Sequence, residues 1–166
     1  MYDVENWFVL TEFPDYSVST FGEIMNNKTK RLLKQTKTPR GSFKVGLIKD
    51  GLQYSRIVKL LVARTFIYGE TEIFDTPINL DGDQRNNRVD NLVWRPRWFA
   101  LNYTRQFKNP NGNQNIGPVV DVDSGELYET IRSAAIENGL LIDEIFESCI
   151  SGDRVFPTWQ KFTFTK

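Results

Sequence analysis

Histidine is absent from the sequence, and cysteine occurs once, at Cys149. One thiol can form neither an intramolecular disulfide nor a cysteine-based zinc site, which needs several thiolate or imidazole ligands. Without histidine, the chain also lacks the commonest general base for proton transfer near neutral pH. We therefore expect no cofactor, and the single thiol fits a reducing, cytoplasmic setting.

Long apolar runs are also missing. No segment approaches the length needed to span a bilayer, and the N-terminus, MYDVENWFVL, has no basic region before an apolar run. The sequence thus predicts a protein that is neither exported nor inserted in a membrane. The 166 residues, 40% of them apolar and without repeats, suffice for one compact domain or two or three small modules.

The net charge is zero, which argues against strong non-specific binding to nucleic acid. The charges are nonetheless clustered. Residues 26–66 carry eleven bases and one acid, and residues 85–108 carry six bases and one acid, while 1–25, 67–84 and 109–166 each have five more acids than bases. Charge fluctuates along any sequence, but an excess of ten bases within 26–66 is typical of a surface that contacts phosphates.

The first part of the chain, Trp7 to Phe66, alternates short β-like runs with turn signals: WFVL, YSVSTFGEIMN, RLLKQ and SFKVGLIKDGLQYSRIV. Asp50-Gly51 suits a two-residue hairpin turn. From Val58 the apolar spacing changes to every three or four residues, which predicts a helix to Phe66 with Lys59 and Arg64 on its exposed side.

The second part of the chain mixes turn-rich segments with three expected helices. The run DGDQRNNRVDNLVW predicts a loop between short strands. Pro96 permits a helix to begin after it, and the polar stretch FKNPNGNQNIGP is the best linker. A hairpin turning at Ser124-Gly125, two helices stopped by Gly139 and Gly152, and a closing strand come next. The expected elements are strands at 77–80 and 92–94, helices at 97–106, 131–138 and 142–151, a linker at 107–118 and a strand at 156–164.

These motifs resemble, in the same order, the modules of HNH homing endonucleases of phages and introns. The segments WFVLTEFPDYSVSTFGEIMNNKTKRLLK and GSFKVGLIKDGLQYSRIVKLLVARTF together resemble the small β module that precedes many of these nucleases. DGDQRNNRVDNLVW resembles the loop and second strand of the ββα-metal motif. VVDVDSGELYET with the two helices after it resembles a C-terminal helix-turn-helix module.

The resemblance implies an α+β fold built from small modules. These are an antiparallel β module with a short helix, a degenerate ββα-metal unit, a linker, and a module with a β-hairpin and a helix-turn-helix. Their expected bounds are 1–66, 67–106, 107–118 and 119–166.

The resemblance also implies a catalytic centre, and this sequence departs from it. In the family a first-strand histidine activates a water, and an asparagine and a second histidine on the following helix help hold a divalent metal. The matching positions hold Asn79, Ala100 and Tyr103. Asparagine is no general base near neutral pH, and alanine cannot ligate a metal, so the sequence predicts no metal at this centre.

An alternative centre could use Asp81, Asp83 and Asn102, because Mg²⁺ prefers oxygen ligands. The structural interpretation is stronger. Asp-Gly-Asp followed by Asn-Asn describes a loop held by its own side chains, with Asn86, Asn87 and Asn91 fixing it between the two strands.

The DNA-binding candidates are basic residues of the two basic blocks, since lysine and arginine neutralise phosphates and arginine also contacts base edges. The second helix of the C-terminal module instead carries Asp143, Glu144 and Glu147, which repel phosphates. The nine candidates are Lys28, Lys30, Arg31, Lys34, Lys44, Lys59, Arg85, Arg95 and Arg97.

The preferred hypothesis is a phage-type protein that binds double-stranded DNA, descended from an HNH homing endonuclease that lost its nuclease activity, and acting as a regulator or by occluding a site. If the gene is viral, its setting is the host cytoplasm. One alternative is a metal-dependent nicking endonuclease with a rearranged site. Another is a protein whose basic face binds a host or phage protein, as an inhibitor or a structural factor.

Overall fold

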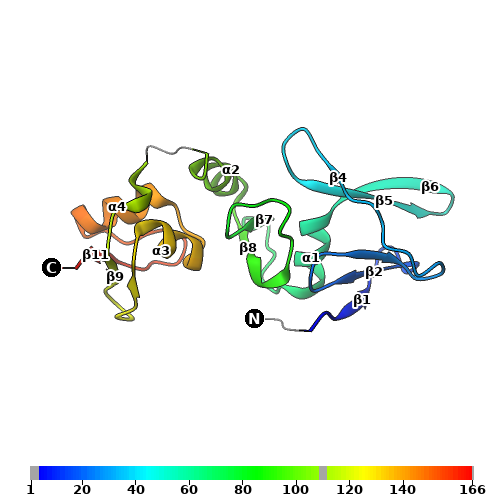
Figure 1. Cartoon of the computed structure of the whole chain (residues 1–166), viewed down its shortest axis with the longest axis horizontal. Helices are drawn as coiled ribbons and strands as arrows, with labels where there is room; N and C mark the ends of the chain where they lie inside the picture. The colour runs from blue at the N-terminus through cyan, green and yellow to red at the C-terminus, as the bar shows by residue number, and fades with distance from the viewer. Residues whose placement is uncertain (1–3, 109–111, 166) are drawn as a thin grey trace. The chain divides into compact units, whose positions relative to one another are not determined.

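The computed structural model describes residues 4–108 and 112–165 (Figure 1). The chain divides into two compact units, Met1–Arg97 and Trp98–Lys166, and each has its own apolar core. The described elements are short strands in small antiparallel sheets and four α-helices. This is the α+β class that the sequence predicts. None of the helices in the described ranges is long and apolar enough to cross a membrane.

The first unit begins with a three-stranded meander, β1 (Trp7–Val9), β2 (Tyr16–Ser19) and β3 (Ile24–Asn26), with β2 in the middle. Gly22 closes the β2–β3 turn at a φ of 86°. A Cβ on Gly22 would lie 2.8 Å from the carbonyl oxygen of Asn87, so only glycine fits there. This turn thus packs against the asparagine-rich loop more than sixty residues further along the chain.

The second sheet has the order β4 (Thr36–Lys37), β5 (Phe43–Lys49) and β6 (Leu52–Ile57). Asp50 and Gly51 turn the β5–β6 hairpin with φ of 52° and 75°, the positive angles expected at a two-residue hairpin turn. The strand expected at RLLKQ is reduced to a single bridge between Leu32 and Met25.

Helix α1 (Val58–Phe66) comes directly after β6. It contributes Val58, Leu61 and Val62 to a core that both sheets share. The chain then forms the antiparallel pair β7 (Thr76–Asn79) and β8 (Leu92–Arg95), with the one-turn helix η1 (Val89–Asn91) before β8. The ends of α1 coincide with the predicted ones, and those of β7 and β8 differ from the predicted ones by at most one residue.

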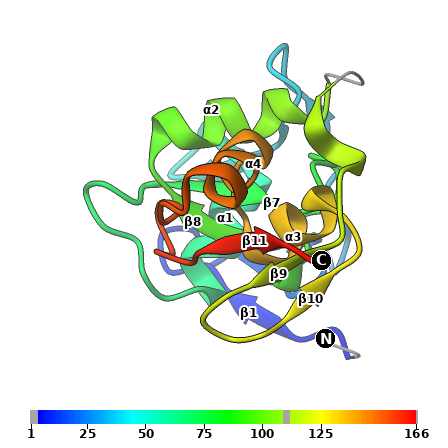
Figure 2. The ribbon, with the colours of Figure 1, turned by 90° about the vertical axis from the view of Figure 1, so that its left-hand side faces the viewer.

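The second unit starts in helix α2 (Arg97–Gln106). Its sheet has the order β10 (Leu127–Tyr128), β9 (Val119–Asp121) and β11 (Phe162–Phe164), and Figure 2 shows helices α3 (Ile131–Asn138) and α4 (Ile142–Ser151) beside it. The closing strand predicted from Phe156 is therefore confined to three residues.

Helices α3 and α4 have the predicted ends. Thr130 caps α3 in a reciprocal box with Ser133, and Gly139 and Gly152 end the two helices in left-handed conformations. Ile142 and Ile145 are buried. Ile150, which the apolar spacing places in the core, is instead 63% exposed.

Helix α2 packs within the second unit. Tyr103 and Phe99 stack on each other, the Tyr103 hydroxyl donates to the carbonyl oxygen of Ala135 (3.2 Å), and Gln106 Oε1 accepts from the backbone N–H of Ile142 (2.9 Å). The boundary between the two units thus lies after the first residue of this helix.

The linker predicted at 107–118 is only partly described, because residues 109–111 lie outside the described ranges. Beyond them, η2 (Asn113–Asn115) forms a helical turn with Gln114 buried. Gln114 donates to the backbone of Gln106 and accepts from Arg132, so this part of the stretch is packed in the second unit.

Candidate functional site

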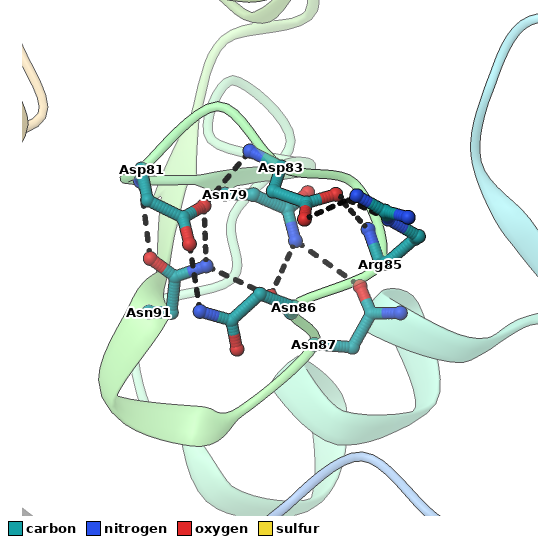
Figure 3. A network of polar contacts seen from close by, with 7 residues as sticks. All are labelled: Asn79, Asp81, Asp83, Arg85, Asn86, Asn87 and Asn91. Carbon is teal, nitrogen blue, oxygen red and sulfur yellow. Dashed lines mark hydrogen bonds and ion pairs between the residues drawn. The ribbon is translucent and has the colours of Figure 1, made fainter.

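The loop between β7 and β8 is held by a network of side chains around Asp81 (Figure 3). Both carboxylate oxygens of Asp81 are used: Oδ1 accepts from the backbone N–H of Asp83 and from Asn91 Nδ2 (2.9 Å each), and Oδ2 accepts from Asn86 Nδ2 (2.7 Å). Asn91 Nδ2 donates further to the carbonyl oxygen of Asn86. The asparagines thus fix the loop as the sequence predicts.

Asn79, at the position of the family's first-strand histidine, lies at the end of β7 and is 4% exposed. Its Nδ2 donates to the carbonyl oxygen of Asn86 (2.8 Å) and to Oδ1 of Asn87 (3.1 Å). Its Oδ1 accepts from Nζ of Lys59 on α1, at 3.4 Å. Asn79 is therefore a connector between the loop and α1.

The contact with Asn79 corrects the expected position of Lys59. Helical spacing places Lys59 on the solvent side of α1, but the β7–β8 pair covers that part of the helix and the side chain is mostly buried. Burial lowers the pKa of the Lys59 ammonium to about 8, since low polarity disfavours the charged form. Lys59 is thus a desolvated cation at the end of β7.

The alternative metal centre at Asp81, Asp83 and Asn102 does not fit the structure. Asp81 accepts three hydrogen bonds from amide donors, and Asp83 bonds to Arg85, whose hydrogen bond holds the pKa of the Asp83 carboxyl below its usual range. Asn102 belongs to the second unit. Within residues 4–108 and 112–165, no group of three acidic, cysteine or histidine side chains could hold a metal ion.

Ala100 and Tyr103, the other two degenerate positions, are buried in the second unit. Ala100 offers no ligand atom. Tyr103 is 1% exposed, and its hydroxyl is engaged by the backbone of α3. Both positions therefore serve packing, whereas Asn79 belongs to the first unit.

A hollow on the outer face of the β4–β5–β6 sheet collects basic and polar side chains. Lys34 and Lys44 line it together with Gln53 and Ser55. The strand alternation explains this placement, because Val45 and Leu47 of β5 point into the core while Lys44 and Gly46 point outward. Gln53 and Ser55 are not among the candidates that the sequence provides, because only the β5–β6 register places them beside Lys44.

The structure sorts the nine basic candidates by environment. Those whose side chains have no hydrogen bond or ion pair among the described residues are Lys30, Arg31, Lys34, Lys44 and Arg97. Lys28 pairs with Asp15 and Arg85 with Asp83, both at the surface. Arg95 is 6% exposed and donates to the carbonyl oxygen of Trp94, so this candidate does not present its guanidinium group at the surface.

Helix α4 carries its acids at the surface. Asp143 and Glu147 are exposed, and burial raises the pKa of the half-buried Glu144. Residues 98–166 carry six bases and nine acids, against fifteen bases and twelve acids in residues 1–97. The bases suited to phosphates are therefore concentrated in the first unit.

The whole fold is similar to that of a solved homing endonuclease. The structure "DNA binding and cleavage by the HNH homing endonuclease I-HmuI" matches with a TM-score of 0.56 over 96% of this chain and 98% of that chain, at 24% identity. At this identity the match concerns the fold alone.

The chain is also similar in sequence to HNH endonucleases. Residues 5–48 match the NUMOD4 motif. The chain is 33% identical over 159 residues to "Uncharacterized HNH endonuclease L245" of Acanthamoeba polyphaga mimivirus, covering 89% of this chain and 44% of that protein. It is 29% identical over 93 residues to "H-N-H endonuclease F-TflII" of Escherichia phage T5, covering 54% and 47%. These similarities relate the chain to HNH endonucleases, and the matches span less than half the length of these curated relatives.

Replacing Asp81 tests whether the loop network is structural. Asp81→Ala removes the acceptor of three hydrogen bonds and is expected to lower the free energy of unfolding by about 1–3 kcal/mol. Asp83→Ala, which removes an exposed pair, is the matched control and should cost below about 1 kcal/mol. Urea unfolding of both variants measures this, and equal losses would contradict a structural role for Asp81.

Proposed function

We propose that this protein binds double-stranded DNA through the outer face of the β4–β5–β6 sheet without cleaving it, as a regulator or by occluding a site. The observation that carries the proposal is the contrast between two places in the first unit. The hollow on the sheet is lined by the bases Lys34 and Lys44 without acidic partners among the described residues, while the position of the family's catalytic histidine holds a buried asparagine.

The chemistry of the degenerate centre supports binding without cleavage. Phosphodiester hydrolysis in this family needs a base that activates water and a metal that neutralises the developing charge. Asn79 supplies no base, and the carboxylates of Asp81 and Asp83 are committed to amide and guanidinium donors. The residues present do not fit a divalent metal.

A second candidate partner is another protein. The second unit carries three more acids than bases, and α4 exposes Asp143 and Glu147 where a DNA-contacting helix would carry bases. This excess of acids favours binding of a protein by the second unit and binding of DNA by the first.

The deciding experiment is a selection from a pool of randomised duplexes in Mg²⁺, with sequencing of both the retained and the cleaved fragments. We expect enriched intact duplexes and no enriched ends. Enriched ends would support a nicking enzyme with a rearranged site, and no enrichment of either kind, even at low salt, would support the protein-binding alternative.

A further inference from the structure

Gly46 lies in the middle of β5, where the backbone itself does not require glycine. It lacks the positive φ of the turn glycines, and it points outward on the sheet face like Lys44. A Cβ at this position would collide with Nε2 of Gln53 on β6. Glycine weakens a strand, and it often marks a place where another group approaches the backbone closely. At position 46 that group is the side-chain amide of Gln53.

The amide of Gln53 is positioned over the sheet without being bonded to it. The register pairs Gln53 with Ile48, so its side chain reaches Gly46 diagonally across the hairpin. Gln53 is exposed, and its amide has no hydrogen bond to the other described residues. The amide thus offers a donor, Nε2, and an acceptor, Oε1, in the hollow that Lys34 and Lys44 also line.

The shape of the hairpin fits the major groove of DNA. Within β5, β4 pairs with Phe43 and Lys44 alone, so β5 and β6 continue beyond it as a two-stranded ribbon that carries Gly46 and Gln53. The major groove of B-form DNA is about 12 Å wide and admits a two-stranded ribbon, whereas the minor groove is only about 6 Å wide.

The distance between Lys44 and Gly46 separates two kinds of contact. The two residues lie on the same face of β5, about 7 Å apart along the strand. When Lys44 contacts a backbone phosphate at the border of the major groove, the amide over Gly46 therefore lies within the width of the groove, where the base edges are exposed.

We propose that Gln53 recognises one adenine in the major groove, with Gly46 as the positioning residue that lets the amide lie across β5. The inference rests on the proposed function and adds to it the base that the sheet face reads. Adenine presents an acceptor, N7, and a donor, the N6 amino group, which match the N–H and the carbonyl oxygen of one amide. Guanine presents two acceptors, N7 and O6, and leaves the amide oxygen without a donor.

The test compares the base preferences of variants in the selection from randomised duplexes. For the wild type we expect one position at which an A·T pair is preferred roughly tenfold. Gln53→Ala should lose the preference at that position and keep the others. Lys34→Ala, in the same hollow, is the matched control. It should weaken binding to all sequences alike, reduce the salt slope by about one unit and keep the preference for adenine.

Gly46→Ala tests the positioning of the amide. This variant retains Gln53 but displaces its amide from β5, so it should reduce the same preference and leave the salt slope unchanged. An unchanged preference in Gly46→Ala would contradict the positioning role. At the selected position, 7-deazaadenine, which lacks the N7 acceptor, should weaken the wild type several-fold and leave Gln53→Ala unaffected.

The outcomes separate failure of this inference from failure of the proposed function. The inference alone is overturned if the wild type binds duplexes and Gln53→Ala keeps every base preference, or if the preference that it loses is for a G·C pair. Duplex binding by the wild type without any sequence preference overturns it as well. If the wild type binds no duplex even at low salt, the proposed function is wrong and the inference fails with it.

Discussion

Reversing the charge of Lys34 and Lys44 together is expected to weaken duplex binding on the order of 100-fold at moderate salt. Both side chains line the hollow on the outer face of the β4–β5–β6 sheet and neither has an acidic partner among the described residues. The slope of log affinity against log salt should also decrease by roughly two units. Titration of a labelled duplex at several salt concentrations measures both quantities.

The matched control is Lys49→Glu with Lys161→Glu, which changes the net charge equally. Lys49 lies on the same strand as Lys44 but alternates to the opposite side, with its Nζ over the Phe13 ring, and Lys161 lies in the second unit. We expect a loss of no more than a few-fold. Equal losses in the two double variants would contradict a defined binding face.

Lys59→Met is expected to increase the free energy of unfolding at pH 7 by roughly 2 kcal/mol. A fall in the pKa from 10.5 to about 8 corresponds to about 3 kcal/mol of desolvation cost, from which about 1 kcal/mol is subtracted for the hydrogen bond that Asn79 Oδ1 loses. Urea unfolding at pH 7 measures the gain.

The pH dependence of this gain has a defined sign. The folded pKa of Lys59 lies below the unfolded one, so the cost of the charge is fully present below pH 8 and decreases as the pH rises toward 10.5. At pH 10 the advantage of Lys59→Met should therefore disappear, because the small remaining cost of the charge is offset by the lost hydrogen bond. Lys34→Met, on the exposed face, is the control without such a change. A constant advantage between pH 7 and 10 would contradict the burial of the ammonium.

Local signals in the sequence predict the local structure well. The Asp50-Gly51 hairpin, the start and end of α1, and the glycine stops of α3 and α4 each depend on a few neighbouring residues. The loop network around Asp81 is predicted for the same reason, because asparagine and aspartate bond to backbone and side chains close in sequence.

The features that local signals do not predict depend on contacts between residues far apart in the chain. The burial of Lys59 depends on β7, twenty residues along the chain, and helical spacing cannot indicate which element will cover that side. The helix α2 can be predicted from the sequence, but its packing on α3 cannot, because it depends on contacts such as that between Tyr103 and Ala135. The degenerate catalytic positions are predicted only through the family resemblance. The resemblance matches residue positions, but it does not indicate how buried those residues are or what they contact.

The most direct test of binding without cleavage uses one end-labelled duplex, selected by the protein, incubated with excess protein in Mg²⁺, in Mn²⁺ and in EDTA. Native and denaturing gels of the same samples then report binding and strand breaks together. We predict equal retardation in all three conditions and intact strands on the denaturing gel. A specific nick that appears with Mg²⁺ or Mn²⁺ and disappears in EDTA would contradict binding without cleavage.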